Sequence, residues 1–221
     1  MIIKQTNRPF VVFDLDDTLF QEIDFLKSAY RHIELLLKPY LEASLADQLY
    51  AVYSNGNNAF KWLLETYKEQ LPSNVDLNFL LHEYRTHLPT IELNADAANF
   101  IKLLQQFSIP LGLITDGRSV TQRNKLTALG IQNIFASIVI SEEFGSEKPN
   151  PANYLHFESL FPSFEFYYFG DNTKKDFIAP LALGWKTICV KNKGENIHNQ
   201  DFTLLSPETL IINSFEEIAF L

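Results

Sequence analysis

The chain has 221 residues, of which 46% are hydrophobic and 14% aromatic, and its formal net charge is -9 at pH 7. This composition supports a sizeable core and argues against a disordered protein. The acidic balance argues against nucleic acid as a partner, because a protein that binds the phosphate backbone needs a basic face. The length suits one core domain with a modest insertion.

Short apolar runs rich in β-branched and aromatic residues predict six strands. They lie at residues 10–13, 111–115, 136–140, 164–169, 187–190 and 210–212. The first few are almost continuously apolar, which is typical of strands covered on both faces. Helices are expected between the later strands, at residues 96–107, 120–129, 151–160 and 174–183. This alternation predicts an α/β fold with a doubly wound parallel sheet.

Residues 22–88 break this rhythm, because they contain no convincing strand over a length greater than a simple crossover needs. Apolar residues recur there at helical spacing in four segments, which predicts a small bundle of four amphipathic helices. The segments begin near Ile23, Leu41, Phe60 and Leu77. We therefore expect a core domain of residues 1–20 and 93–221, interrupted by a helical domain of residues 21–92.

The N-terminal segment and the single cysteine bear on the expected compartment. Cys189 has no partner for an internal disulfide. The first ten residues lack the apolar stretch and small-residue cleavage site of a signal peptide. No apolar run approaches the roughly 20 residues that a membrane span requires. We expect a cytoplasmic protein without a membrane partner.

Polar side chains follow four of the predicted strands, at the point where each strand ends. They come from DLDDTL (Asp14 and Asp16), ITDG (Thr115, Asp116 and Gly117), SEEFGSEKPNP (Lys148) and GDNTKKD (Asp171, Asn172 and Asp176). Because the carboxyl ends of parallel strands share one edge of a sheet, these loops are expected to converge. Asp14, Asp16 and Asp171 would then form a pocket suited to a hard divalent cation. The cation and Lys148 would supply the positive charge that clustered carboxylates need.

In this order, DLDDTL, ITDG, EKPNP and GDNTKKD resemble the motifs of the haloacid dehalogenase superfamily of phosphohydrolases. The motifs span about residues 10–190. The resemblance implies a Rossmann-like core, Mg²⁺ as the cofactor and a small phosphorylated substrate. It also implies that Asp14 attacks the phosphoryl group and forms an aspartyl-phosphate. Asp16 would be the general acid for the leaving alcohol and then the base that activates water.

The resemblance implies roles for the remaining motif residues as well. Thr115 would bind a phosphate oxygen, helped by the backbone N–H groups of Asp116 and Gly117. Lys148 would reduce the repulsion between Asp14 and the phosphate and stabilise charge in the transition state. The implied ligands of Mg²⁺ are Asp14, Asp171 and Asp16, the last through its backbone carbonyl. Asp176 and Asn172 would support the ion without binding it directly.

Several charged residues near the motifs have simpler explanations. Many relatives have Asn where this chain has Asp116, and that extra carboxylate is expected either to pair with Arg118 or Arg123 or to cap the following helix. Asp17 is typical of a turn or helix-cap residue. Lys174 and Lys175 are expected on a solvated helix face, and residues 191–201 in a surface loop.

In this superfamily an insertion at the position of residues 21–92 is a mobile lid, called the C1 cap, that excludes water and contacts the leaving group. Such a lid favours small substrates over proteins and nucleic acids. We expect a Mg²⁺-dependent phosphomonoesterase that acts on a sugar phosphate or a nucleoside monophosphate. Two alternatives within the superfamily are a phosphosugar mutase and a 2-haloacid dehalogenase, and a catalytically silent binding protein is a third. The sequence leaves open the physiological substrate, the specificity residues of the cap and the oligomeric state.

Overall fold

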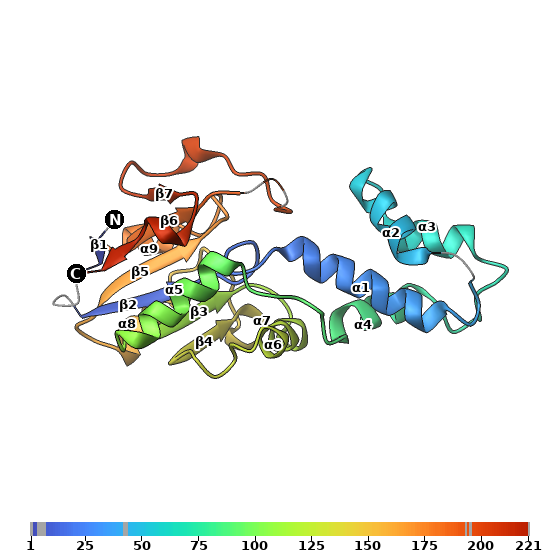
Figure 1. Ribbon diagram of the computed structural model, residues 1–221, viewed down its shortest axis with the longest axis horizontal. Coiled ribbons are helices and arrows are strands. Elements are labelled where there is room, and N and C mark those ends of the chain that lie inside the picture. The colour runs from blue at the N-terminus through green and yellow to red at the C-terminus, as the bar shows by residue number, and fades with distance from the viewer. Residues whose placement is uncertain (1, 4–7, 42–43, 193, 195, 221) are drawn as a thin grey trace.

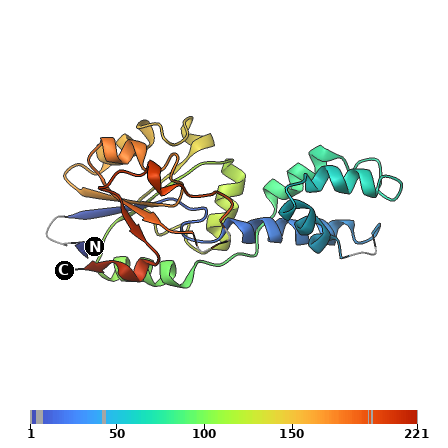
Figure 2. The ribbon, with the colours of Figure 1, turned by 90° about the horizontal axis from the view of Figure 1, so that it is seen from above.

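The computed structural model describes residues 2–3, 8–41, 44–192, 194 and 196–220. Figure 1 shows two lobes, which we call the core lobe and the helical lobe. The core lobe is a sheet with helices on both faces. The helical lobe is formed by α1 to α4, residues 22–86, and projects from one end of the core lobe (Figures 1 and 2).

The sheet of the core lobe has six parallel strands in the order β4-β3-β2-β5-β6-β7. The strands are β2 (Pro9–Phe13), β3 (Leu111–Thr115), β4 (Ser137–Ile140), β5 (Glu165–Gly170), β6 (Lys186–Val190) and β7 (Leu210–Ile212). The six predicted strands and the doubly wound α/β fold are confirmed. Strands β1 (Ile2–Ile3) and β8 (Ala219–Phe220) form a separate parallel pair, and each is too short to produce a recognisable sequence pattern.

Helices cover both faces of the sheet, which explains why its strands are continuously apolar. Helices α5 (Ala95–Gln106) and α6 (Ser119–Ala128) belong to the cluster that contains Val11 and Phe13. Helix α8 (Ala152–Leu160) and helix α9 (Ile178–Ala182) belong to the cluster on the opposite face, with Phe10 and Val12. Alternate residues of β2 therefore point into different halves of the core.

The predicted helices at residues 96–107, 120–129 and 151–160 are confirmed as α5, α6 and α8. The prediction at residues 174–183 is wrong in its first half, because residues 173–177 form turns and α9 begins only at Ile178. The Asp176 carboxylate accepts backbone N–H groups from Asp171 and Asn172, and such local bonds compete with helix formation. The short helix α7 (Ser141–Phe144) was not predicted.

The four helices predicted between the first two strands of the sheet are present. They are α1 (Glu22–Leu37), α2 (Leu45–Ser54), α3 (Ala59–Thr66) and α4 (Leu77–Thr86). Helix α1 packs on α2 and α4, and α3 contacts the same two helices. Their apolar faces enclose Ile33, Leu49, Leu63 and Leu80, which are fully buried. None of the described helices is both long and apolar enough to cross a membrane.

The two lobes also touch beside their connecting segments. Helix α6 of the core lobe lies against α4. The Thr121 hydroxyl donates to the Arg85 carbonyl at 3.0 Å, and the Asn124 side chain donates to the Thr86 carbonyl at 2.8 Å. One face of α6 therefore contacts the end of the helical lobe.

Candidate active site

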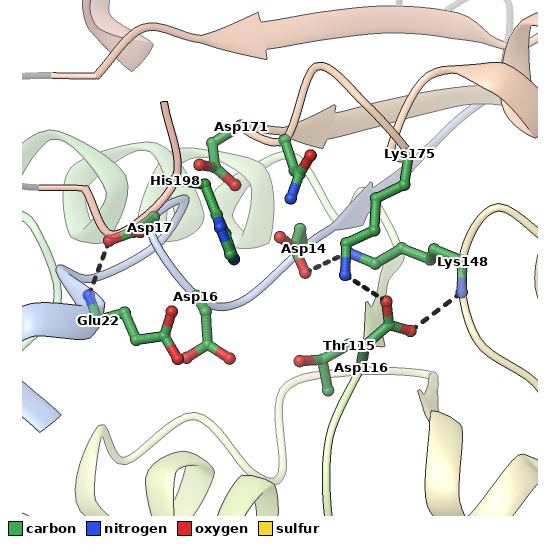
Figure 3. Close-up of a pocket in the computed structure, with 11 residues that line it drawn as sticks. Asp14, Asp16, Asp17, Glu22, Thr115, Asp116, Lys148, Asp171, Lys175 and His198 are labelled. Atoms are coloured by element: carbon green, nitrogen blue, oxygen red, sulfur yellow. Dashed lines mark hydrogen bonds and ion pairs between the residues drawn. The ribbon is translucent and has the colours of Figure 1, made fainter. Parts of the chain in front are cut away.

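A cavity of about 90 Å³ lies at the edge of the sheet where β2, β3 and β5 end, close to the start of α1 (Figure 3). Its lining is almost entirely charged or polar. The lining residues are Asp14, Asp16, Asp17, Glu22, Thr115, Asp116, Lys148, Asp171, Asn172, Lys175 and His198. The four predicted loops therefore converge on one cavity, as the parallel sheet requires.

Asp14 lies directly after β2 and is paired with Lys148. The backbone N–H of Asp14 donates to the Phe169 carbonyl at 2.8 Å, which fixes the residue beside β5. Lys148 Nζ lies 2.6 Å from Asp14 Oδ1 and 2.8 Å from Asp176 Oδ1. Burial lowers the pKa of Lys148, but the charges of Asp14 and Asp176 outweigh it and hold that pKa well above its ordinary value. Lys148 is therefore a buried cation shared by two carboxylates.

Asp176 is held from both sides. It is 0% exposed, and its Oδ2 accepts N–H groups from Asp171 at 3.2 Å and Asn172 at 2.9 Å. Gly170 permits this arrangement, because a Cβ atom at that position would lie only 2.6 Å from Asp176 Oδ2. Both oxygens of Asp176 already have partners in the protein, which fits a supporting role better than direct contact with an ion.

The buried carboxylates carry more negative charge than Lys148 can neutralise. Oxygen atoms of Asp14, Asp171 and Asp176 all lie within 4.8 Å of one another. Burial raises the pKa of Asp14 to about 7, although Lys148 opposes the shift. Burial, followed by the charges of Asp176 and Asp14, raises the pKa of Asp171 to about 9. A divalent cation would favour the ionised forms and reverse these shifts, so Asp14 and Asp171, with Asp176 beside them, fit a site for a divalent cation.

The Asp16 side chain does not join this carboxylate cluster. Its Oδ1 lies 2.6 Å from Lys125 Nζ, and its Oδ2 accepts a hydrogen bond from Gln122 at 2.9 Å. Glu22, the first residue of α1, lies 3.9 Å from the same Lys125. Burial and the charge of Asp16 raise the pKa of Glu22 to about 8, with Lys125 opposing the shift. The structure therefore places Asp16 at the rim of the cavity that faces α6 and α1.

The structure corrects the expected surroundings of Asp116. Asp116 Oδ2 lies 2.6 Å from Lys175 Nζ, and its Oδ1 accepts the Lys148 backbone N–H at 3.0 Å. Both expected alternatives are wrong, because Asp116 pairs with neither Arg118 nor Arg123 and the N-cap position of α6 has no side-chain cap. Those arginines pair with Glu142 and Glu143 instead. The expectation that Lys175 lies on a solvated face is also wrong, because Lys175 lines the cavity.

Of the residues predicted to bind phosphate, Thr115 lines the cavity and Gly117 does not. Thr115 is 1% exposed, and its hydroxyl oxygen accepts a hydrogen bond from Gln122, which leaves the O–H available as a donor. The Gly117 N–H donates to Ser141 Oγ at 2.9 Å, and Gly117 does not line the cavity. A phosphate contact by Gly117 would therefore require that bond to open, whereas Thr115 already faces the cavity.

A loop after β6 contributes residues that sequence reasoning missed. The Asn196 side chain donates to Asp171 Oδ2 at 3.1 Å, and the Ile197 N–H donates to Asp17 Oδ2 at 2.9 Å. His198 lines the cavity, and Figure 3 shows its ring between Asp17 and Asp14. Asp17 also accepts the Glu22 N–H, in agreement with its predicted turn or cap role. The expected surface loop at residues 191–201 is thus partly a wall of the cavity, although residues 193 and 195 lie outside the described residues.

Two curated relatives share most of the chain. The glyceraldehyde 3-phosphate phosphatase of Methanopyrus kandleri is 29% identical over 194 residues, which cover 82% of this chain and 83% of that protein. The glyceraldehyde 3-phosphate phosphatase of Methanocaldococcus jannaschii is 26% identical over 223 residues and covers 94% of each. The predicted enzyme class, a phosphatase of the haloacid dehalogenase superfamily, agrees with these relatives.

Solved structures share the fold. YfnB from Bacillus subtilis, bound to magnesium, aligns with a TM-score of 0.64 at 21% identity, covering 95% of this chain and 96% of that chain. CbbY from Rhodobacter sphaeroides, in complex with phosphate, aligns with a TM-score of 0.60 at 16% identity and covers 97% of each. The family model described as haloacid dehalogenase-like hydrolase matches residues 11–190. This match includes all four motifs, and the chain belongs to the haloacid dehalogenase-like hydrolase family.

Proposed function

We propose that this protein is a Mg²⁺-dependent phosphomonoesterase that hydrolyses a small sugar phosphate through an aspartyl-phosphate intermediate. The observation that carries the proposal is the buried Asp14, which lies 2.6 Å from Lys148 in a cavity at the ends of the strands. The chain's family and its relatives named as phosphatases support the same reaction class.

In the proposed reaction, a carboxylate oxygen of Asp14 attacks phosphorus and the bond to the leaving alcohol oxygen breaks. Lys148 limits the repulsion between Asp14 and the phosphate, and the Thr115 hydroxyl donates to a phosphate oxygen. Asp16 gives a proton to the leaving alcohol. It then takes a proton from the water that hydrolyses the aspartyl-phosphate.

Mg²⁺, when bound by Asp14, Asp171 and the Asp16 backbone carbonyl, would neutralise charge on the phosphoryl group and orient it. Asp176 and Asn172 would support this arrangement without binding the ion. The Asp176 contacts with Lys148 and with two backbone N–H groups favour that role. Lys175 would keep the extra carboxylate of Asp116 neutralised near the phosphate.

The substrate beyond its phosphoryl group would lie between the two lobes. The cavity is lined almost entirely by charged and polar side chains, which suits a phosphoryl group and a bound cation. Glu22, the first residue of α1, lines this cavity, and the helical lobe extends away from that point (Figure 1). We propose that residues 21–92 are a lid domain that covers the leaving group, with hinges near residues 20–22 and 89–93.

Phosphate release from a panel of monophosphates, with Mg²⁺ and with EDTA, tests the proposal. Glyceraldehyde 3-phosphate is the first substrate to try, because the relatives are named for it, and nucleoside monophosphates form the comparison set. We expect activity on a sugar phosphate that EDTA removes. Asp14→Asn should lower kcat by at least about a thousandfold, because the nucleophile is lost. The control Asp47→Asn, at an exposed position of α2, should remain active.

Three results would redirect the assignment. Substantial turnover by a pure Asp14→Asn preparation would contradict the proposed nucleophile. Release of halide from a 2-haloacid without any need for metal would favour the dehalogenase. Transfer of phosphate between positions of a sugar without its release would favour the mutase.

A further inference from the structure

We propose that Lys125, together with Gln122, is a positioning residue that holds the Asp16 carboxyl group where it meets the leaving alcohol. The inference rests on the proposed function, in which Asp16 is the general acid. It gives a positioning role to two residues of α6 that lie outside all four motifs.

Two side chains of α6 hold Asp16, one on each oxygen. Gln122 and Lys125 are three residues apart, so they project from the same face of the helix. Lys125 Nζ lies 2.6 Å from Asp16 Oδ1, and Gln122 Nε2 lies 2.9 Å from Asp16 Oδ2. Contacts to both oxygens fix the rotation of the carboxyl group as well as its position.

The ammonium group of Lys125 is buried among aromatic rings, which is unusual for a lysine that serves only in packing. Lys125 is 3% exposed, and its Nζ lies 4.5 Å from the centre of the Phe25 ring and 5.7 Å from that of Phe20. Removing an ammonium group from water is costly unless a partner compensates. The partner at hydrogen-bond distance is Asp16, whose side chain is 19% exposed toward the cavity. The buried ammonium group of Lys125 therefore contacts a carboxyl group, that of Asp16, which lines the cavity.

Gln122 ties this arrangement to the phosphate site. Its Nε2 also donates to the Thr115 hydroxyl, and the Asp116 carbonyl oxygen lies 3.2 Å from the same nitrogen. One amide group thus spans Asp16 and Thr115, the residue expected to bind a phosphate oxygen. The bridge sets the spacing between the proton donor and the phosphoryl group, on which efficient proton transfer depends.

The test compares two leaving groups. A sugar alkoxide must be protonated as it leaves, whereas p-nitrophenolate leaves readily without a proton. We would measure kcat/KM for the best sugar phosphate of the panel and for p-nitrophenyl phosphate. This ratio reports only the steps up to and including release of the alcohol. Lys125→Met should lose at least about tenfold more on the sugar phosphate than on p-nitrophenyl phosphate. The control Lys102→Met, at an exposed position of α5, should change neither value.

A structural role alone would lower both values by the same factor, and that result would overturn the inference. Two further variants keep the test decisive if Lys125→Met does not fold. Gln122→Leu should show the same preference for p-nitrophenyl phosphate, and Lys125→Arg should restore most of the sugar phosphate activity. Adding Lys125→Met to Asp16→Asn should cost little more, because both changes affect the same proton transfer. A wild-type protein that hydrolyses neither substrate would instead contradict the proposed function itself.

Discussion

The core lobe and the helical lobe bury different kinds of side chain. At the edge of the sheet the protein buries Asp14, Lys148, Asp171 and Asp176, together with Lys125 on α6. In the helical lobe, among residues 22–41 and 44–86, the buried side chains are apolar or aromatic apart from Ser28. Buried charges are costly and contribute little net stability, whereas buried apolar surface drives folding. We infer that the buried charges of the core lobe serve the proposed reaction, whereas the buried side chains of the helical lobe serve packing.

After loss of the nucleophile Asp14, replacing Lys148 should have the largest effect on activity. Lys148→Met leaves Asp14 without its cation, so repulsion of the incoming phosphate is no longer offset. We expect kcat/KM for the sugar phosphate to fall by about a hundredfold or more. The exposed Lys186→Met is the matched control. If circular dichroism shows folded Lys148→Met and its activity is normal, the buried charges serve another purpose and the comparison fails.

Replacing Leu49 should instead affect stability. Leu49 is fully buried in α2, and Leu49→Ala should lower the free energy of unfolding by about 2–5 kcal/mol through the cavity that it leaves. The same change at Leu35, which is 68% exposed on α1, should cost less than about 0.5 kcal/mol. Denaturant titration measures both. A large loss of kcat in folded Leu49→Ala would show that the core of the helical lobe contributes to catalysis as well as to stability.

The smallest expected effect lies at His87, beside the junction of the lobes. His87 donates through Nδ1 to the Tyr84 carbonyl and stacks near His32, with ring centres 5.5 Å apart. Burial lowers the pKa of His87 below its ordinary value of 6.5, with His32 adding to the shift and Tyr84 opposing it. The folded state therefore prefers neutral His87, and this contribution to stability is present above pH 6.5 and lost as the pH falls through the lowered pKa.

Melting temperatures at about pH 7 and about pH 5 test this sign. On acidification, the melting temperature of the wild type should fall further than that of His87→Phe. This variant removes the titrating group and keeps a ring of similar shape. An equal loss in the two proteins would assign the acid sensitivity to other groups.

The motif residues could be predicted because strand ends are marked in the sequence. Apolar runs locate β2, β3 and β5, and the polar residues that follow them must meet at one edge of the sheet. Lys125 could not be found in this way, because it lies 109 residues from Asp16 and sits in a helix whose pattern resembles any surface helix. His198 was missed for a related reason. Its loop is polar apart from Ile197, and only the folded chain shows that His198 lines the cavity.

The sequence-based predictions for the partner of Asp116 and for the location of Lys175 were also wrong. A charged residue near a motif has several candidate partners at short sequence distance, and Arg118 and Arg123 were the nearest cations along the chain. The actual partner, Lys175, is 59 residues away from Asp116. Spatial proximity at a sheet edge depends on strand order, which sequence spacing does not reveal.

Gly170 contributes no functional group, yet its missing side chain governs the electrostatics of the cavity. A single methyl group at this position would press on Asp176 and displace the carboxylate that shares Lys148 with Asp14. Variation at residue 170 is therefore limited by a reaction in which that residue takes no part. Attempts to stiffen the end of β5 by replacing this glycine would disturb the charge balance of the cavity before they strengthened the fold.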